Sequence, residues 1–127
     1  MHFAELRVYQ LSEQLADLVW GSVEKWRPLA RSTVGSQLVR AADSIGANIA
    51  EGSGRGSYKD NKRFARISRG SFNEVQHWLR RAYRRKLLTA DDTARLKPMM
   101  DTLGPLLNAY LKSIGTTRKT HSVSNDQ

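Results

Sequence analysis

Residues 57 to 86 form one continuous stretch in which apolar residues recur with the period of an α-helix and most other positions are basic. At about 100° per residue, the cations fall on the arc opposite the apolar and small residues. This pattern predicts a single long helix with one side built for a core and the other for anions. The core-facing arc comprises Phe64, Ile67, Ser68, Ser71, Phe72, Val75, Trp78, Leu79 and Ala82.

The whole net charge of the protein resides in this helix. From Arg55 to Lys86 there are eleven Lys and Arg residues against only Asp60 and Glu74, and the rest of the 127-residue chain carries ten basic and ten acidic side chains. An excess of positive charge lowers the stability of a fold through self-repulsion. The concentration of this charge on one helix therefore indicates a polyanionic partner. The predicted nucleic-acid-binding residues are Lys59, Lys62, Arg63, Arg66, Arg69, Arg80, Arg81, Arg84 and Arg85.

A face of exposed charges can also be merely solvated. Such a face normally mixes signs, with Glu and Lys four residues apart, whereas this one is nearly all positive. The sequence pI of about 10.4 then favours nucleic acid over acidic small molecules. Binding to an anionic membrane surface is disfavoured, because the apolar arc of the helix is too continuous to remain outside a core.

The rest of the chain is also predicted to be helical, since it has no alternating β-branched run and no hairpin turn signal. The first helix is expected over residues 3–26 and is stopped by Pro28. The second is expected to begin at Ser32 or Thr33, either of which can cap it, and its small residues, including Gly46, indicate close helix contacts. The buried seam predicted for the second helix is Val34, Leu38, Ala42, Ile45 and Ile49.

Three glycines at alternate positions, Gly52, Gly54 and Gly56, are predicted to supply positive φ angles and to end the second helix. No strand precedes them and a Walker-type ending is missing, so they do not form a phosphate-binding loop. Capping boxes are predicted at Ser57, before the basic helix, and at Thr89, before the fourth helix. Pro105 is expected to kink the fourth helix, whose apolar heptad is Leu96, Met100, Leu103, Leu107, Tyr110 and Ile114.

Four helices with short connectors predict an all-α, antiparallel up-down-up-down four-helix bundle over residues 1–115. The polar residues 116–127 are expected to form a disordered tail. Cysteine is absent, which excludes disulfides and thiolate metal sites. No run is long enough for a transmembrane helix and no secretory signal is recognised, so a cytoplasmic location and no membrane partner are expected.

No catalytic, cofactor or metal site is predicted. His2, His77 and His121 are far apart in the sequence, whereas a metal site needs clustered ligands at fixed spacing. The serines and histidines lack a recognisable acid partner for a hydrolytic triad. We therefore expect a protein that is not an enzyme, with its three tryptophans in the core or at a subunit interface.

Segment 36–55, with the sequence SQLVRAADSIGANIAEGSGR, resembles the signature of the bacterial four helix bundle protein family. This family is also called the large-subunit ribosomal RNA intervening-sequence proteins, and the accessory variability determinant of diversity-generating retroelements is a related branch. Two positions depart from the family pattern: Gly46 stands where Pro is usual, and Lys86 stands where Gly is usual near the turn after the third helix. Further matches are Val8-Tyr9-Gln10, Arg63-Phe64, Ile67 through Ser71, and Glu74.

The resemblance implies a small four-helix bundle that assembles as a ring-like homopentamer without enzymatic activity. For the retroelement branch it also implies a positive surface that binds nucleic acid and associates with a reverse transcriptase. For the ribosomal branch it implies a gene within an intervening sequence of ribosomal RNA. The branch to which this chain belongs stays open at this point.

Some residues of the matching motif are candidates for a structural role. The favoured interpretation is a hydrogen-bond network that holds the glycine turn at the end of the second helix, and the alternative is a shared polar site. Glu74 is expected to pair with Arg55, Arg63 or Arg81 rather than to act chemically. The structural motif residues are Asn48, Glu51, Gly52, Gly54, Arg55 and Glu74.

The sequence supports two hypotheses about function. In the first, a non-catalytic oligomer binds the backbone of RNA or DNA through the outer face of its third helix, including the case of a reverse-transcriptase accessory factor of a diversity-generating retroelement. In the second, the protein is an interaction scaffold for an acidic protein, and its contact with nucleic acid is incidental. Both depend on the basic helix being accessible in the assembly.

Overall fold

The computed structural model describes residues 2–115, and within them every regular element is helical. Four long helices account for most of this part of the chain, which confirms the predicted all-α class. A 3₁₀ turn, Phe3–Glu5, precedes the first of them, and a short helical segment precedes the second. The helices are α1 (Arg7–Val23), α2 (Pro28–Ala30), α3 (Ser36–Ser53), α4 (Tyr58–Arg84) and α5 (Ala90–Ser113).

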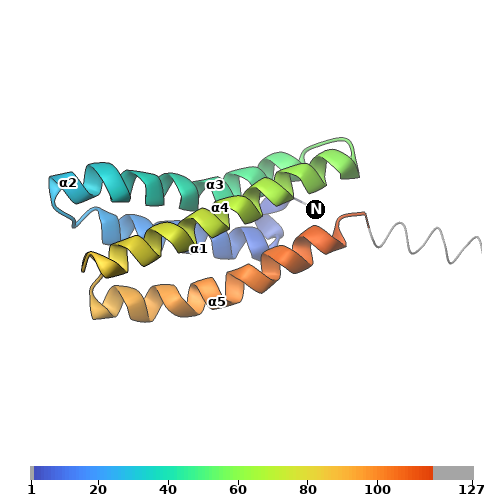
Figure 1. Cartoon of the computed structure of the whole chain (residues 1–127). Coiled ribbons are helices and arrows are strands. Elements are labelled where there is room, and N and C mark those ends of the chain that lie inside the picture. Colours follow the sequence, from blue (N-terminus) through green and yellow to red (C-terminus); the bar gives the residue numbers. More distant parts are fainter. Residues whose placement is uncertain (1, 116–127) are drawn as a thin grey trace, which may run out of the picture.

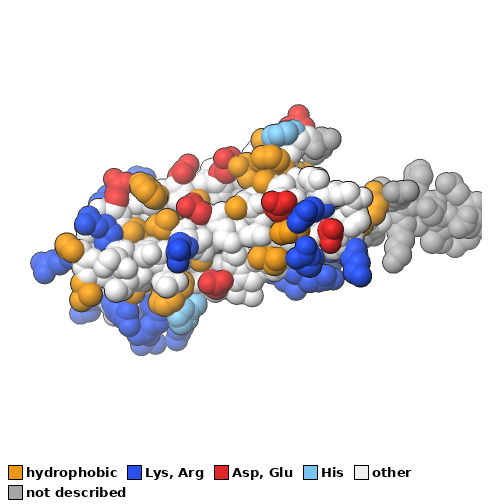
Figure 2. Space-filling model, turned by 90° about the horizontal axis from the view of Figure 1, so that it is seen from above, with side chains coloured by type: hydrophobic (Ala, Val, Ile, Leu, Met, Phe, Trp, Pro, Cys, Tyr) orange, Lys and Arg blue, Asp and Glu red, His pale blue; other side chains and the backbone are white. Residues whose placement is uncertain are grey.

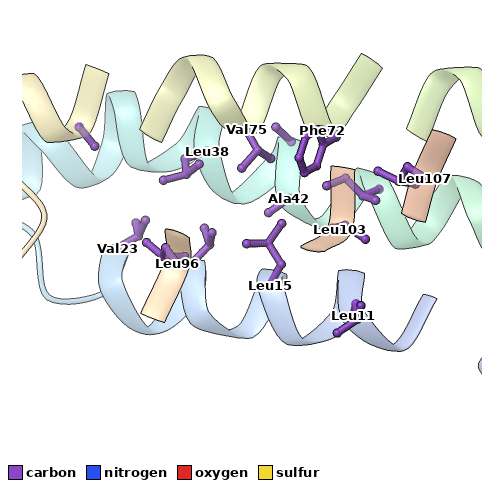
Figure 3. Close-up of a cluster of buried hydrophobic side chains, with 14 of the residues drawn as sticks. Leu11, Leu15, Val23, Leu38, Ala42, Phe72, Val75, Leu96, Leu103 and Leu107 are labelled. Carbon is purple, nitrogen blue, oxygen red and sulfur yellow. The ribbon is translucent and has the colours of Figure 1, made fainter. Parts of the chain in front are cut away.

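The four long helices lie side by side along the length of the molecule (Figure 1). α3 packs on α1 and α4, and α5 packs on the same two helices from the other side. The core runs between them as layers of aliphatic side chains (Figure 3), among which Leu15, Leu38 and Leu103 are completely buried. Each fully buried leucine contributes about 1.5–3 kcal/mol relative to an exposed one, so the bundle is held chiefly by this apolar seam.

The seam predicted for the second helix is confirmed, because all five of its residues are buried. The packing role predicted for Gly46 is also confirmed. A Cβ at this position would lie 2.9 Å from Ser12 Oγ and 3.4 Å from a ring carbon of Tyr9. The glycine therefore lets the backbone of α3 approach α1.

The first helix is shorter than predicted at both ends. The residues before α1 form the separate 3₁₀ turn, and the helix ends at Val23, three residues before the buried Trp26. Pro28 does not terminate α1 but occupies the first position of α2. At that position the missing N–H would have had no intrahelical partner anyway, and the fixed φ suits a helix.

The predicted start of the second helix at Ser32 or Thr33 is wrong. A π-helical turn, Arg31–Gly35, joins α2 to α3, so these two residues lie inside a helical stretch. Their hydroxyls cap nothing and instead donate to the carbonyl of Leu29, at 3.3 Å from Ser32 and 2.7 Å from Thr33. Serine and threonine hydroxyls inside helices commonly donate to a backbone carbonyl in the preceding turn, as these two do.

The glycines after α3 do not use positive φ angles, contrary to the prediction. Within residues 2–115, positive φ occurs only at Lys86 and Gly115. Gly54 is the C-cap of α3 with φ −88° and ψ −1°, a conformation open to any residue. The break in the helix therefore does not depend on the conformational freedom of glycine at this cap.

Side-chain caps fix the beginnings of α4 and α5. The Ser57 hydroxyl accepts from the backbone N–H of Asp60 at 3.2 Å, so the cap is confirmed, although no return bond from Asp60 completes a box. The predicted box at Thr89 is complete, with Asp92 as its acidic member. α5 continues through two prolines, and the kink at Pro105 stays a prediction.

The predicted heptad of α5 faces the interior. Leu96, Leu103, Leu107 and Ile114 are buried, and the other two members are half-buried. Within residues 2–115, none of the helices combines the length and the apolar character needed to cross a bilayer. The predicted disordered tail, residues 116–127, lies outside the described residues.

Candidate nucleic-acid interface

The cationic residues of the basic helix lie on the outer side of α4. Seven of the nine predicted binding residues are exposed, and Lys62 and Arg81 are half-exposed. Arg85 is the C-cap of the helix and thus extends the row beyond its last turn. The predicted division of α4 into a core side and a cationic side therefore holds for every cation named.

The cations form two groups that share one direction. The N-terminal group comprises five residues from Lys59 to Arg69, and the C-terminal group comprises four residues from Arg80 to Arg85. Arg66 and Arg84 are eighteen residues apart. Eighteen residues make five full turns, so the two side chains leave the helix in the same direction about 27 Å apart along its axis.

Figure 2 shows this arrangement from above. Blue Lys and Arg side chains gather in two groups along the lower edge of the view, one toward each end. Most red Asp and Glu side chains lie in the upper half. Basic and acidic side chains thus lie mostly on different sides of this face, and the cations of α4 form two groups separated by the stretch between Arg69 and Arg80.

Few of these cations are neutralised inside the protein. Among residues 2–115, the only ion pair made by a predicted binding residue joins Arg63 Nε to Asp60 Oδ1 at 3.8 Å, and both side chains are about half exposed. An exposed pair of this kind contributes less than about 1 kcal/mol. Glu74 is exposed and forms none of the ion pairs predicted for it. The charge of α4 therefore stays directed toward solvent.

The inner side of α4 fixes the direction of the cations through its contact with α3. Phe72, Val75 and Ala82 are buried in the core. The Ser68 hydroxyl, which is completely buried, donates to the carbonyl of Ile45 at 2.8 Å and so bonds α4 to the backbone of α3. Rotation of α4 about its axis would break this buried hydrogen bond and leave its donor and acceptor without partners. The bond therefore holds the orientation of α4 against α3.

One residue of the predicted core arc is misplaced. Ile67 is 42% exposed, whereas Ala65, on the other border of the arc, is 3% exposed. The buried arc is thus rotated slightly toward Ala65, because the small alanine allows close approach to a neighbouring helix.

Asn48 takes part in a polar chain between α3 and α4. Its Nδ2 donates to the carbonyl of Ser44 at 2.8 Å and to Ser44 Oγ at 2.9 Å, and Ser44 Oγ lies 2.9 Å from Ser71 Oγ. The contact between the two serine hydroxyls joins α3 to α4, and Asn48 supports it from within α3 rather than holding the glycine turn as predicted.

Glu51 and Arg55 do meet at the end of α3, with an Nε–Oε2 distance of 3.6 Å. The guanidinium groups of Arg55 and Arg63 both lie over the Phe64 ring, at 4.8 Å and 4.6 Å from its centroid. Each such contact contributes about 0.5–1 kcal/mol at an exposed site. The Phe64 ring thus holds two cationic side chains close together near the N-terminal end of α4.

Contact with α5 also positions one cation. Arg69 Nη1 donates to Asn108 Oδ1 at 3.5 Å. No sequence pattern marks this partner, because Asn108 lies 39 residues further along the chain and is not part of an apolar heptad. The bond is long and therefore weak.

Lys86 ends α4 in a left-handed conformation with φ 59°. Its N–H donates to the Tyr83 carbonyl at 3.0 Å, and the Leu87 N–H donates to the Ala82 carbonyl at 2.9 Å. This pair of bonds is the Schellman motif, which glycine usually provides at this position. The family usually has glycine near this turn. In this chain a lysine takes its place, in a left-handed backbone conformation that glycine adopts without strain.

Asp92 holds the start of α5 against α1. Its Oδ1 accepts from the Ser22 hydroxyl at 2.9 Å in a buried contact, and its Oδ2 accepts from the Thr89 N–H at 3.0 Å. Burial alone would raise the pKa of Asp92, but these hydrogen bonds and the charge of Lys25 outweigh it and lower the pKa below its ordinary value of 3.8. The carboxylate is thus a structural anchor at the end of the bundle that carries the C-terminal cationic group.

The fold and its charged face define a small helical-bundle protein with one cationic helix on its outside. A family model described as 23S rRNA-intervening sequence protein matches residues 4–109, so the chain belongs to that family. This confirms the family resemblance seen in the sequence.

The fold is similar to that of a crystal structure described as a protein of unknown function from the S23 ribosomal protein family of Bacteroides thetaiotaomicron. The TM-score is 0.73 at 23% sequence identity, and the match covers 84% of this chain and 99% of the other. At that identity the likeness concerns the fold. A comparison with curated proteins found no match.

Proposed function

We propose that this protein binds the phosphate backbone of RNA or DNA through the outer face of α4. The observation that carries the proposal is the pair of cationic groups, which share one direction on a single helix and make one weak internal ion pair among residues 2–115. A surface with so many uncompensated charges gains most from a ligand that carries a regular row of negative charges.

The proposed binding is driven by neutralisation of phosphates and release of their counterions. Arg and Lys contacts with phosphates position a protein on nucleic acid but do not read its sequence. Guanidinium groups stay protonated at all physiological pH values, so they serve binding and not proton transfer. The proposed role is accordingly non-catalytic, with little base specificity.

The proposed binding unit is an up-down-up-down bundle within a homo-oligomer. Support for the connectivity comes from the short segments between the long helices and from the packing of each helix on its neighbours in the chain. The homopentamer follows from the family resemblance and stays a prediction. The name of the family makes a fragment of large-subunit ribosomal RNA a suitable structured probe.

A charge-reversal variant tests the proposal. The variant should lose affinity for a structured RNA fragment in electrophoretic mobility-shift assays while its circular dichroism spectrum keeps its helical form. Normal RNA binding by this variant would contradict the assignment of the interface to α4. The four substitutions are Arg66→Glu, Arg69→Glu, Arg80→Glu and Arg84→Glu.

A matched control separates the position of the charge from its amount. The control also reverses four exposed cations, so its net charge equals that of the test variant, but the residues lie on or near α1 to α3. It should keep most of its affinity for the same RNA. Equal losses in the two variants would mean that net charge alone governs binding. The control substitutions are Arg7→Glu, Arg27→Glu, Arg31→Glu and Arg40→Glu.

The scaffold hypothesis concerns the same face with an acidic protein as its partner. Association with a reverse transcriptase or another protein stays a prediction. Pulldown with the wild-type protein from a nuclease-treated lysate tests it, because a protein partner that persists after nuclease treatment does not depend on nucleic acid.

A further inference from the structure

A groove of about 370 Å³ lies between the C-terminal half of α4 and the N-terminal half of α5. Its walls are mostly apolar, and the one aromatic side chain among them is Tyr83, which is 64% exposed. The volume lies in the range of sites that bind small organic groups. The apolar part of the lining consists of Leu79, Leu88, Leu96 and Met100.

The groove is part of the C-terminal cationic group. Arg80 of α4 and Lys97 of α5 both line it, and Arg84 follows one turn after Arg80. Among residues 2–115 Arg80 makes no ion pair, whereas Lys97 Nζ lies 3.3 Å from Asp101 Oδ2 in an exposed pair. An apolar floor with a cationic rim is complementary to a ligand in which a flat ring is joined to a phosphate.

We infer that this groove receives an unpaired base of a single-stranded nucleic acid, with Tyr83 stacking on the base and Arg80 contacting the adjacent phosphate. The inference rests on the proposed function and specifies its ligand. In a duplex each base is stacked between its neighbours, whereas a single strand can present a base face to an aromatic side chain. Single-stranded segments are therefore the preferred ligand.

Paired binding measurements test the inference at one fixed salt concentration. The probes are an oligouridine strand of about 20 nucleotides, long enough to reach both cationic groups, and an RNA duplex of the same length. Tyr83→Ala should weaken binding of the strand about tenfold and change binding of the duplex by less than about twofold. Tyr83→Phe keeps the ring and should bind the strand as the wild type does.

Leu29→Ala is the matched control, because Leu29 is an apolar side chain that is 77% exposed and lies outside the groove. It should leave the affinities for both probes unchanged. Helical content and oligomeric state are measured for every variant by circular dichroism and sedimentation velocity. A Tyr83→Ala variant that changes oligomeric state would identify the groove as a contact between copies and overturn the inference.

Two further outcomes separate the inference from the proposed function. If Tyr83→Ala binds the strand as tightly as the wild type, or weakens both probes equally, the groove does not stack a base although α4 still binds phosphates. If the wild type binds neither probe at low salt, the proposed function fails and the inference fails with it. Selective loss of strand binding supports both.

Discussion

Gly52 is the residue at which a single methyl group should do the most damage to the packing of α4 on α3. A Cβ there would lie 2.7 Å from Asn61 Oδ1 and 2.8 Å from Phe64 Cβ. Carbon atoms in contact are normally about 3.5–4.0 Å apart, and Phe64 Cβ is attached to the backbone, so it cannot rotate away. The substitution Gly52→Ala therefore forces the helices apart or bends one of them.

The magnitude follows from two opposing effects. Overpacking at such a contact costs about 1–3 kcal/mol, and alanine recovers up to about 1 kcal/mol through its higher helix propensity. Gly52→Ala should thus lower the free energy of unfolding by up to about 2 kcal/mol. For a domain of this size, each kcal/mol corresponds to a fall in Tm of about 4 °C.

Gly54 provides the matched control two residues away. Its Cβ position is open, with the nearest atom, the Glu51 carbonyl oxygen, at 3.7 Å, and its φ of −88° suits alanine. Gly54→Ala should raise the free energy of unfolding by about 0.4–1 kcal/mol, because it restricts the unfolded chain. The two variants are compared by urea and thermal denaturation at equal protein concentration. If Gly54→Ala destabilises as much as Gly52→Ala, the close-contact explanation is refuted.

Three further predictions concern the end of α4, the start of α5 and the length of the ligand. Lys86→Gly should raise the free energy of unfolding by about 1 kcal/mol in urea denaturation, since a left-handed residue other than glycine is strained, whereas Lys86→Ala should not. Because the pKa of Asp92 is lowered in the folded state, its carboxylate stabilises the protein above pH 3.8, and this stabilisation is lost as the pH falls through the lower pKa of the folded state. Urea denaturation of Asp92→Asn between about pH 2 and 6 should therefore lack this part of the pH dependence of the wild type. About 8 base pairs of duplex DNA span the roughly 27 Å between the two cationic groups. A shorter duplex should bind more weakly per phosphate than a longer one in fluorescence-anisotropy titrations. No change in affinity per phosphate across this length would mean that the two cationic groups act separately.

The sequence predicted the features that depend on periodicity. The heptad of α5, the seam of α3 and the outward direction of the cations all follow from which residues can share one side of a helix. Family membership also followed from the segment 36–55. These properties need no knowledge of which helices touch.

The features that the sequence analysis missed have three different causes: an earlier helix start, a contact between two helices, and the spacing of charges along one helix. Ser32 and Thr33 resemble helix caps, but Pro28 is a better first residue and the helix had already begun. The need for glycine at position 52 arises from the approach of α4 and not from its own φ angle. Glu74 was expected to pair with a cation because many are near in sequence, yet on a helix only residues three or four apart meet, and no Lys or Arg stands at that spacing from Glu74.

The salt dependence of binding to a DNA duplex tests the central claim most directly. The logarithm of the affinity is plotted against the logarithm of the KCl concentration for the wild type, for Arg66→Gln with Arg84→Gln, and for the control pair Arg7→Gln with Arg40→Gln. Loss of two phosphate contacts on α4 should reduce the magnitude of the slope by about 1.8 for a duplex, while the control pair keeps the wild-type slope. Equal slopes for all three proteins would contradict phosphate binding by this face of α4.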